Sequence, residues 1–177
     1  MTLPTHIVVD TNVATTANAQ NAGAPADCVA ACARALEHTM KSGHVYIDHG
    51  GGASAIVAEY RRNLSAKGQP GPGDAFLKWL LIHEWSDQRV TRVCITPKAC
   101  DPEDYEELPA PSDGTVYDRS DRKFLAVAAA HPEHPAILQA FDSKWWGWRE
   151  ALSAAGVRIE FLCPHAIAAK HQQKMGA

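Results

Sequence analysis

Three apolar segments of the chain each end on an aspartate, a residue that is unfavourable in a buried strand. Asp10 ends HIVVD, Asp48 ends HVYID and Asp142 ends AILQAFD. Three further acids, Glu59, Asp118 and Asp121, lie in or beside segments with helical periodicity. Taken singly, each acid has a purely structural explanation, because aspartate caps helices and forms turns, and helix surfaces carry glutamate.

The acids are harder to explain as a set, because like charges that lie within a few ångströms repel one another and destabilise a fold. A cation would remove that repulsion. Carboxylate oxygens are the ligands that Mg²⁺ or Mn²⁺ prefers, whereas zinc prefers nitrogen and sulfur. Such ions activate water and stabilise charge on a phosphodiester. The chemistry that these residue types indicate is therefore metal-dependent hydrolysis at a phosphate.

The surrounding elements must bring the acids together. Apolar strand patterns at residues 6–10, 44–48, 89–95, 136–142 and 157–162 alternate with helical patterns at 25–43, 53–64, 74–85, 121–130, 144–156 and 164–175. This alternation predicts one domain over residues 1–177, a three-layer α/β/α sandwich with a mainly parallel sheet. Parallel strands place their carboxyl ends at one edge, where ligands bind in open sheets. Residues 13–24 read as a flexible loop, Asp74 as the cap of its helix, and 66–117 as an insertion with an extra helix and a long acidic loop.

The motifs HIVVDTNV, AEYRRNL, DRSDRKFLAVA and AILQAFDSKW, in this order, resemble the PIN domain, a Mg²⁺/Mn²⁺-dependent nuclease fold found in many toxins of bacterial toxin–antitoxin pairs. The resemblance implies hydrolysis of RNA to a 5′-phosphate and a 3′-hydroxyl. It implies that Asp10, Asp121 and Asp142 are metal ligands, and that Glu59 is a ligand or positions water. The small toxins are shorter than this chain, which carries the insertion at 66–117.

Several neighbouring residues take supporting roles in this interpretation. The side-chain amide of Asn12 is expected to orient Asp10 or a metal-bound water, and Asp48 and Asp118 are outer-shell candidates. Asp118 competes with Asp121 for the third acid position, and Asp121 is preferred because the apolar stripe follows it directly. The basic residues expected to contact a phosphate backbone are Arg62, Arg122, Lys123 and Lys144. Charged residues on solvated helices explain them equally well.

Composition limits the alternatives. A net charge of −3 gives no overall attraction to nucleic acid. The five cysteines are odd in number and include no CxxC pair, so we expect no disulfide framework or zinc ribbon, and Cys28 and Cys32 read as small buried hydrophobic residues. With no signal peptide pattern in MTLPTH and no apolar run of about 20 residues, a cytoplasmic protein without membrane contacts is expected.

Other catalytic motifs are incomplete. HGGG at residues 49–52 has no accompanying GxSxG, and HPEHP at 131–135 has no PCxxC. Two other functions stay open beside the ribonuclease: a catalytically inactive binding or scaffold domain of the same fold, and another metal-dependent phosphohydrolase, although DTN lacks the second acid of a DxD loop. The partners to expect are RNA, an inhibitory antitoxin-like protein and a second copy of the chain.

Overall fold

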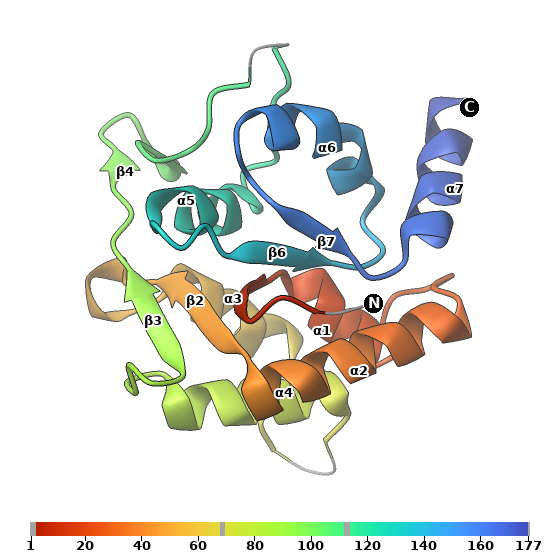
Figure 1. The fold of residues 1–177 in the computed structure, drawn as a ribbon, viewed down its shortest axis with the longest axis horizontal. Helices are drawn as coiled ribbons and strands as arrows, with labels where there is room; N and C mark the ends of the chain where they lie inside the picture. Colours follow the sequence, from red (N-terminus) through yellow and green to blue (C-terminus); the bar gives the residue numbers. More distant parts are fainter. Residues whose placement is uncertain (1–2, 68–69, 112–113, 177) are drawn as a thin grey trace.

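The central feature is a single parallel sheet of five strands in the order β3-β2-β1-β6-β7 (Figure 1). The computed structural model describes residues 3–67, 70–111 and 114–176. The strands of this sheet are β1 (His6–Val9), β2 (His44–Asp48), β3 (Val90–Val93), β6 (Ala136–Gln139) and β7 (Ile159–Phe161). The predicted α/β class with a parallel sheet is confirmed.

The middle of the sheet is the core of the protein. Ile7, Val8 and Val9 of β1 are fully buried, because helices cover both faces of the sheet and leave no polar side for these residues. β1 pairs with β2 on one side and with β6 on the other, so Ile7 lies opposite both Val45 and Ala136. The ends of β1 and β2 and the loop after β6 therefore meet at one edge.

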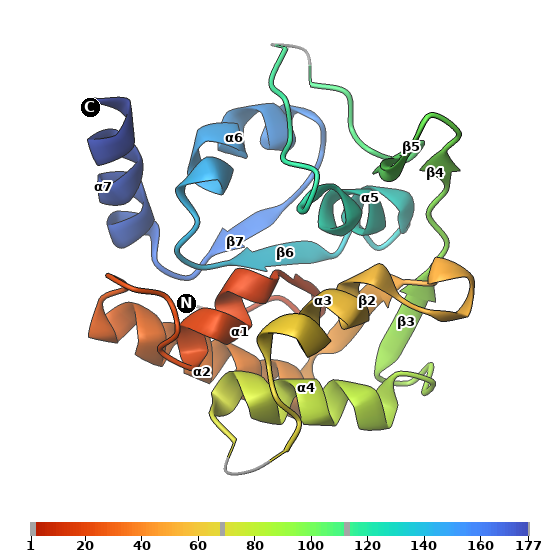
Figure 2. The same ribbon diagram turned by 180° about the vertical axis from the view of Figure 1, so that it is seen from behind.

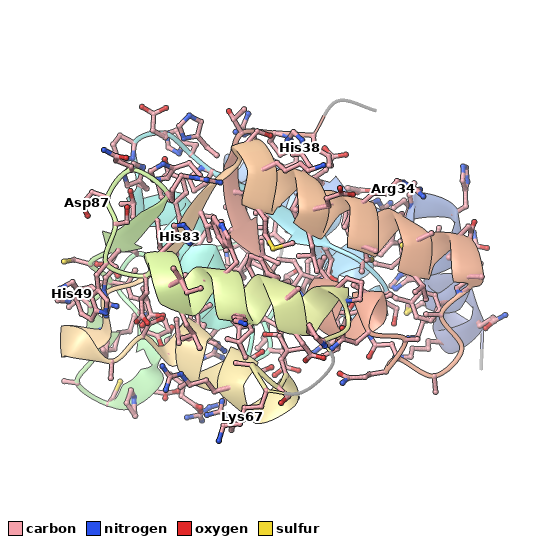
Figure 3. All side chains as sticks on the ribbon, turned by 90° about the horizontal axis from the view of Figure 1, so that it is seen from below. Arg34, His38, His49, Lys67, His83 and Asp87 are labelled. Carbon is pink, nitrogen blue, oxygen red and sulfur yellow. A yellow bond between two sulfur atoms is a disulfide. The ribbon has the colours of Figure 1, made fainter. Side chains whose placement is uncertain are left out.

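Helices form a layer on each face of this sheet, as expected for a three-layer sandwich. α5 (Arg122–Ala130) and α6 (Ser143–Ala154) lie on one side, with α7 (Pro164–Met175) beside α6 (Figures 1 and 2). α1 (Thr11–Ala17), α2 (Ala26–Ser42) and α4 (Pro72–His83) pack together on the other side. α2, which carries Arg34 and His38, runs beside α4, which carries His83 (Figure 3). α3 (Ala55–Asn63) follows the short 3₁₀ turn η1 (Gly50–Gly52) and packs on β2.

The loop predicted for residues 13–24 is wrong in its first part, where the chain forms α1. Asp10 caps this helix, and Val13, Ala14 and Ala17 are buried at helical spacing. The prediction failed because threonine, asparagine and alanine dominate the segment, and their polarity hid a short apolar stripe. The signal that could have found it was an N-capping aspartate followed by apolar residues at helical intervals.

The segment from 66 to 117 contains more regular structure than expected. Besides α4, it forms a short antiparallel hairpin of β4 (Pro97–Lys98) and β5 (Asp101–Tyr105) beside α5 (Figure 2). Asp74 does not occupy the cap position of α4, which belongs to Gly71. It lies three residues later and accepts hydrogen bonds from the Gly71 and Ser65 N–H groups at 3.1 and 2.8 Å.

A disulfide joins Cys28 in the first turns of α2 to Cys163, the residue that precedes α7. The expectation of no disulfide is therefore wrong, and so is the interpretation of Cys28 as only a buried hydrophobic residue. Nothing in the spacing could indicate the pair, because 135 positions separate its members and the fold alone brings them together. Cytoplasmic thiols are usually kept reduced, so the state of this bond depends on its compartment.

Across the described ranges 3–67, 70–111 and 114–176, no helix is long and apolar enough to cross a bilayer.

Candidate metal centre at the carboxyl edge of the sheet

Asp10 lies at the end of β1 and is only 4% exposed. In the described part of the chain its side chain accepts one hydrogen bond, from the Asn12 N–H to Oδ1 at 2.7 Å, which caps α1. Burial and then the negative charge of Asp121 hold the pKa of Asp10 well above its usual range. Glu59 and Asp142 add to this rise, and the Asn12 N–H opposes it. The negative charges of all three other acids predicted to act with Asp10 therefore raise its pKa.

Asp121 directly precedes α5 and is 7% exposed, while Asp142 caps α6 by accepting the Lys144 N–H at 3.1 Å. Burial raises the pKa of Asp121 to about 6 despite the opposing charge of Lys144, and Asp142 and Asp118 contribute to the rise. Asp118 is exposed, at the rim of the cluster. The preference for Asp121 over Asp118 as the central acid agrees with their burial.

The ammonium group of Lys144 stands among these acids. Its Nζ lies 2.6 Å from Asp118 Oδ2, 3.2 Å from Asp121 Oδ2 and 3.5 Å from Asp142 Oδ2. Burial alone would lower the pKa of Lys144, but the surrounding carboxylates raise it above its ordinary value. Asp121 Oδ2 is buried, and the Lys144 ammonium is the charged group that lies beside it. A cation already occupies the centre of the acids, and it is one of the protein's own side chains.

Glu59 projects from α3 and pairs with a second lysine. Glu59 Oε2 lies 2.5 Å from the Nζ of Lys123, which is 8% exposed and also donates to the Ser120 carbonyl. The neighbouring Tyr60 donates its hydroxyl to the Val9 carbonyl at the end of β1. This contact fixes α3 against the strand that carries Asp10, so Glu59 is held near the cluster by packing.

Asn12 orients the site differently from the prediction. Its main-chain N–H, rather than its side-chain amide, holds Asp10. The side-chain Oδ1 accepts the Phe141 N–H at 2.6 Å and so fixes the loop that carries Asp142. One residue thus connects the two strand ends that supply Asp10 and Asp142.

Asp48 has a structural task. Its two oxygens accept the Ser54 hydroxyl at 2.7 Å and the N–H groups of Ala55 and Ile56, each at 2.8 Å. The carboxylate is buried and occupied by the amino end of α3. These bonds leave Asp48 serving the fold, and they give it no part in the acid cluster.

The predicted phosphate-contacting residues divide into two groups. Arg62 is exposed on α3, beside Glu59 in sequence. Arg122 pairs with Asp101 at 3.6 Å, and Lys123 and Lys144 are engaged as described above. Only Arg62 of the four therefore presents its charge outward without an ion pair among the described residues.

Two residues near Asp142 were not predicted to affect the site. Lys170 of α7 donates to the Phe141 carbonyl at 2.9 Å, and the His171 ring lies 3.1 Å from the Ser143 carbonyl. They hold the two neighbours of Asp142 in place. No sequence signal could have identified them, because their partners lie almost thirty residues away.

The donor set fits a hard divalent cation in its chemistry, since five carboxylates face two ammonium groups. The spacing fits it less closely. Among the described residues, the group of metal-type ligands whose donor atoms all lie within 4.8 Å of one another is Cys28, Cys32 and Cys163, and the acids are not so close. Three of them surround Lys144 and Glu59 pairs with Lys123, so an ion at this position requires the Lys144 ammonium to withdraw and the acids to move closer together.

No protein-family model, curated protein or solved structure matches this chain.

Proposed function

We propose that the protein is a divalent-metal-dependent ribonuclease with a PIN-like fold. The observation that carries this proposal is the convergence of Glu59, Asp121 and Asp142 on Asp10, a buried acid whose pKa is held well above the usual range by burial first and then by these charges. Acids gathered in this way, with strongly perturbed pKa values, are typical of cation-binding and catalytic sites.

Asp10, Asp121 and Asp142 would hold Mg²⁺ or Mn²⁺, with Glu59 as a further ligand or as the acid that positions water. The bound ion supplies an activated water and stabilises charge on the phosphodiester. The chain's own groups prepare this site. The Asn12 N–H fixes one oxygen of Asp10, and the Lys144 N–H fixes one oxygen of Asp142. Capping thus uses one oxygen of each carboxylate and leaves the other for the ion.

RNA is the proposed substrate because of the resemblance in motifs and because Arg62 lies exposed on α3 near Glu59, where it can contact a phosphate. The products would be a 5′-phosphate and a 3′-hydroxyl. The role of a toxin or phage-defence nuclease, acting in the cytoplasm and restrained by an inhibitory protein, belongs to the same proposal.

The test compares cleavage of single-stranded RNA and DNA by the wild type, Asp10→Asn and Asp121→Asn, with Mn²⁺, with Mg²⁺ and with EDTA. Asparagine keeps the size and the capping oxygen of Asp10, so loss of activity would report the lost charge. Asp87→Asn is the matched control, because Asp87 is exposed before β3, toward the amino edge of the sheet (Figure 3).

We expect both site variants to lose at least about 100-fold in rate and Asp87→Asn to match the wild type. Metal-dependent cleavage that survives in both site variants would overturn the site assignment. Mn²⁺ binding without cleavage of RNA or DNA would instead favour a scaffold domain. Hydrolysis of small phosphate esters in its place would favour another phosphohydrolase.

A further inference from the structure

Three cysteine sulfurs converge between α2 and the start of α7. The Sγ atoms of Cys28, Cys32 and Cys163 all lie within 4.8 Å of one another. Cys28 and Cys32 are one helical turn apart on α2, so they face the same direction, and Cys163 approaches them from the junction of β7 and α7. Cys32 is the free thiol beside the disulfide.

The three cysteines are buried, but two of them line a small cavity. All three cysteines are buried, with Cys32 fully so. A small cavity of about 100 Å³ is lined by both disulfide cysteines together with Asp27 and His165. A reductant or an ion can therefore approach the sulfurs from this side, and the cavity has room for a water molecule. The carboxylate of Asp27 gives its wall a negative charge that attracts cations.

We propose that Cys28, Cys32 and Cys163 form a second metal site, a three-thiolate centre for a soft ion such as Zn²⁺, which exists when the disulfide is reduced. The site thus has two states, a disulfide with a free thiol or a metal thiolate. It is independent of the carboxylate centre and of the ribonuclease proposal.

The geometry suits this ion. Sulfurs bound to one tetrahedral zinc lie about 3.8 Å apart, given Zn–S distances of about 2.3 Å. Opening the disulfide lets Cys28 and Cys163 move apart toward that separation, and Cys32 needs a shift of about 1 Å or less. Three protein ligands and one water from the cavity complete four-coordination.

The reaction balances with a dithiol or phosphine reductant. The reductant gives two electrons to the Cys28–Cys163 bond, which breaks. A dithiol supplies the two protons that the sulfurs take up and is oxidised to a disulfide. With a phosphine, one water molecule supplies both protons and the oxygen of the phosphine oxide. Zn²⁺ then displaces one proton from each of the three thiols. Cys28 lies in the first turn of α2 and Cys163 precedes α7, so both sulfurs are near helix amino ends, which favour thiolates.

The experiment adds Cd²⁺, a spectroscopic substitute for Zn²⁺, to the full chain with Cys94 and Cys100 both replaced by serine. These two free cysteines are exposed, and their removal eliminates background binding. Thiolate-to-metal charge-transfer absorbance and the metal stoichiometry are measured with and without phosphine reduction. We expect one Cd²⁺ per reduced chain with absorbance for three thiolates, and no such band in the oxidised chain.

Cys32→Ser added to this background should weaken Cd²⁺ affinity by roughly 100-fold. The comparison of oxidised and reduced protein needs no variant of the cluster, so a folding defect in Cys32→Ser cannot hide the result. Equal absorbance before and after reduction, or unchanged affinity in a folded Cys32→Ser, would overturn the proposal.

Discussion

The ends of β1 and β2 begin from the same pattern and reach opposite results. In each, buried apolar residues lead to an aspartate at the carboxyl end of a parallel strand, Asp10 in one and Asp48 in the other. Asp48 accepts three hydrogen bonds from the amino end of α3. Asp10 accepts one and stands among other acids. A strand-ending acid is thus available for chemistry only where the following backbone leaves it unsatisfied.

The chain that follows each strand causes the difference. After Asp10 the helix α1 begins at once, so a single N–H group returns to the carboxylate. After Asp48 three glycines, all at positive φ, turn the chain back so that residues 54–56 point their donors at it. A Cβ on Gly50 would lie 2.9 Å from Asp48 Oδ2, so glycine is needed for this close wrap. The glycines of the HGGG motif therefore turn the chain so that Asp48 can accept the N–H groups at the amino end of α3.

The largest expected effect is a loss of protein stability when Asp48, at the end of β2, is replaced. Asp48→Ala leaves the Ser54 hydroxyl and two N–H groups of α3 without their acceptor, in buried or half-buried positions. Each buried donor left unpaired costs about 1–3 kcal/mol, so we expect a loss of at least about 3 kcal/mol in the free energy of unfolding. Urea denaturation followed by circular dichroism measures it.

Asparagine at the two positions is the matched pair for this experiment. Asp48→Asn brings an amide NH₂ toward N–H donors and should also destabilise the protein. Asp10→Asn keeps an oxygen for the cap of α1 and removes a buried charge, so it should stabilise the protein at pH 8. Similar losses of stability in Asp48→Asn and Asp10→Asn would contradict the distinction between a structural role for Asp48 and a functional role for Asp10.

The second prediction concerns the pH dependence that Asp121 imposes. Its pKa of about 6 in the folded protein exceeds the value of about 3.9 for an unfolded aspartate, so the folded state holds this proton more tightly. Stability should therefore fall as pH rises from about 4 to about 6 and stay lower above that. Asp121→Asn removes the loss, by up to about 3 kcal/mol at pH 8.

Denaturation midpoints of the wild type and Asp121→Asn between pH 4 and pH 8 test this sign, with Asp87→Asn as the control. The raised pKa of Asp10 acts in the same direction. Mn²⁺ should reverse the effect in the wild type, because the ion binds the ionised acids and stabilises the folded state. If the stability of the wild type rises between pH 4 and pH 6 relative to that of Asp121→Asn, the folded state does not disfavour the ionised acids and the prediction is wrong.

The sequence was sufficient to predict the parallel sheet, because β-branched and apolar runs such as Ile7–Val9 bury both faces of a strand whatever their neighbours are. It was also sufficient to predict that Asp10 lies near Asp142, since parallel strands share one carboxyl edge, whereas Asp121 was indicated only by the resemblance in motifs. The sequence could not show that the carboxylate of Asp48 accepts three hydrogen bonds from backbone and hydroxyl donors while that of Asp10 accepts one. That distinction depends on whether backbone donors return to the carboxylate, which only the path of the chain determines.

Contacts between distant segments were equally outside its reach. The sequence predicts that Lys144 contacts a phosphate backbone, but its position on the first turn of α6 puts it among three acids of its own chain. The partners of Cys28 and Lys170 likewise come from segments that the fold alone brings near. Residue type predicts which chemistry is available, and tertiary packing decides which partner uses it.

The smallest expected effect is on the affinity of the acid cluster around Asp10 for a divalent ion. If the ammonium of Lys144 competes with a divalent ion for Asp121 and Asp142, Lys144→Met should tighten Mn²⁺ binding by about tenfold, or about 1.4 kcal/mol. Calorimetric titration at pH 8 measures it, and Lys78→Met, which removes the same charge from the exposed surface of α4, should leave affinity unchanged. Weaker binding in Lys144→Met than in Lys78→Met would mean that Lys144 supports the site instead of occupying it, since removing a competitor can only strengthen the ion's hold on the acids.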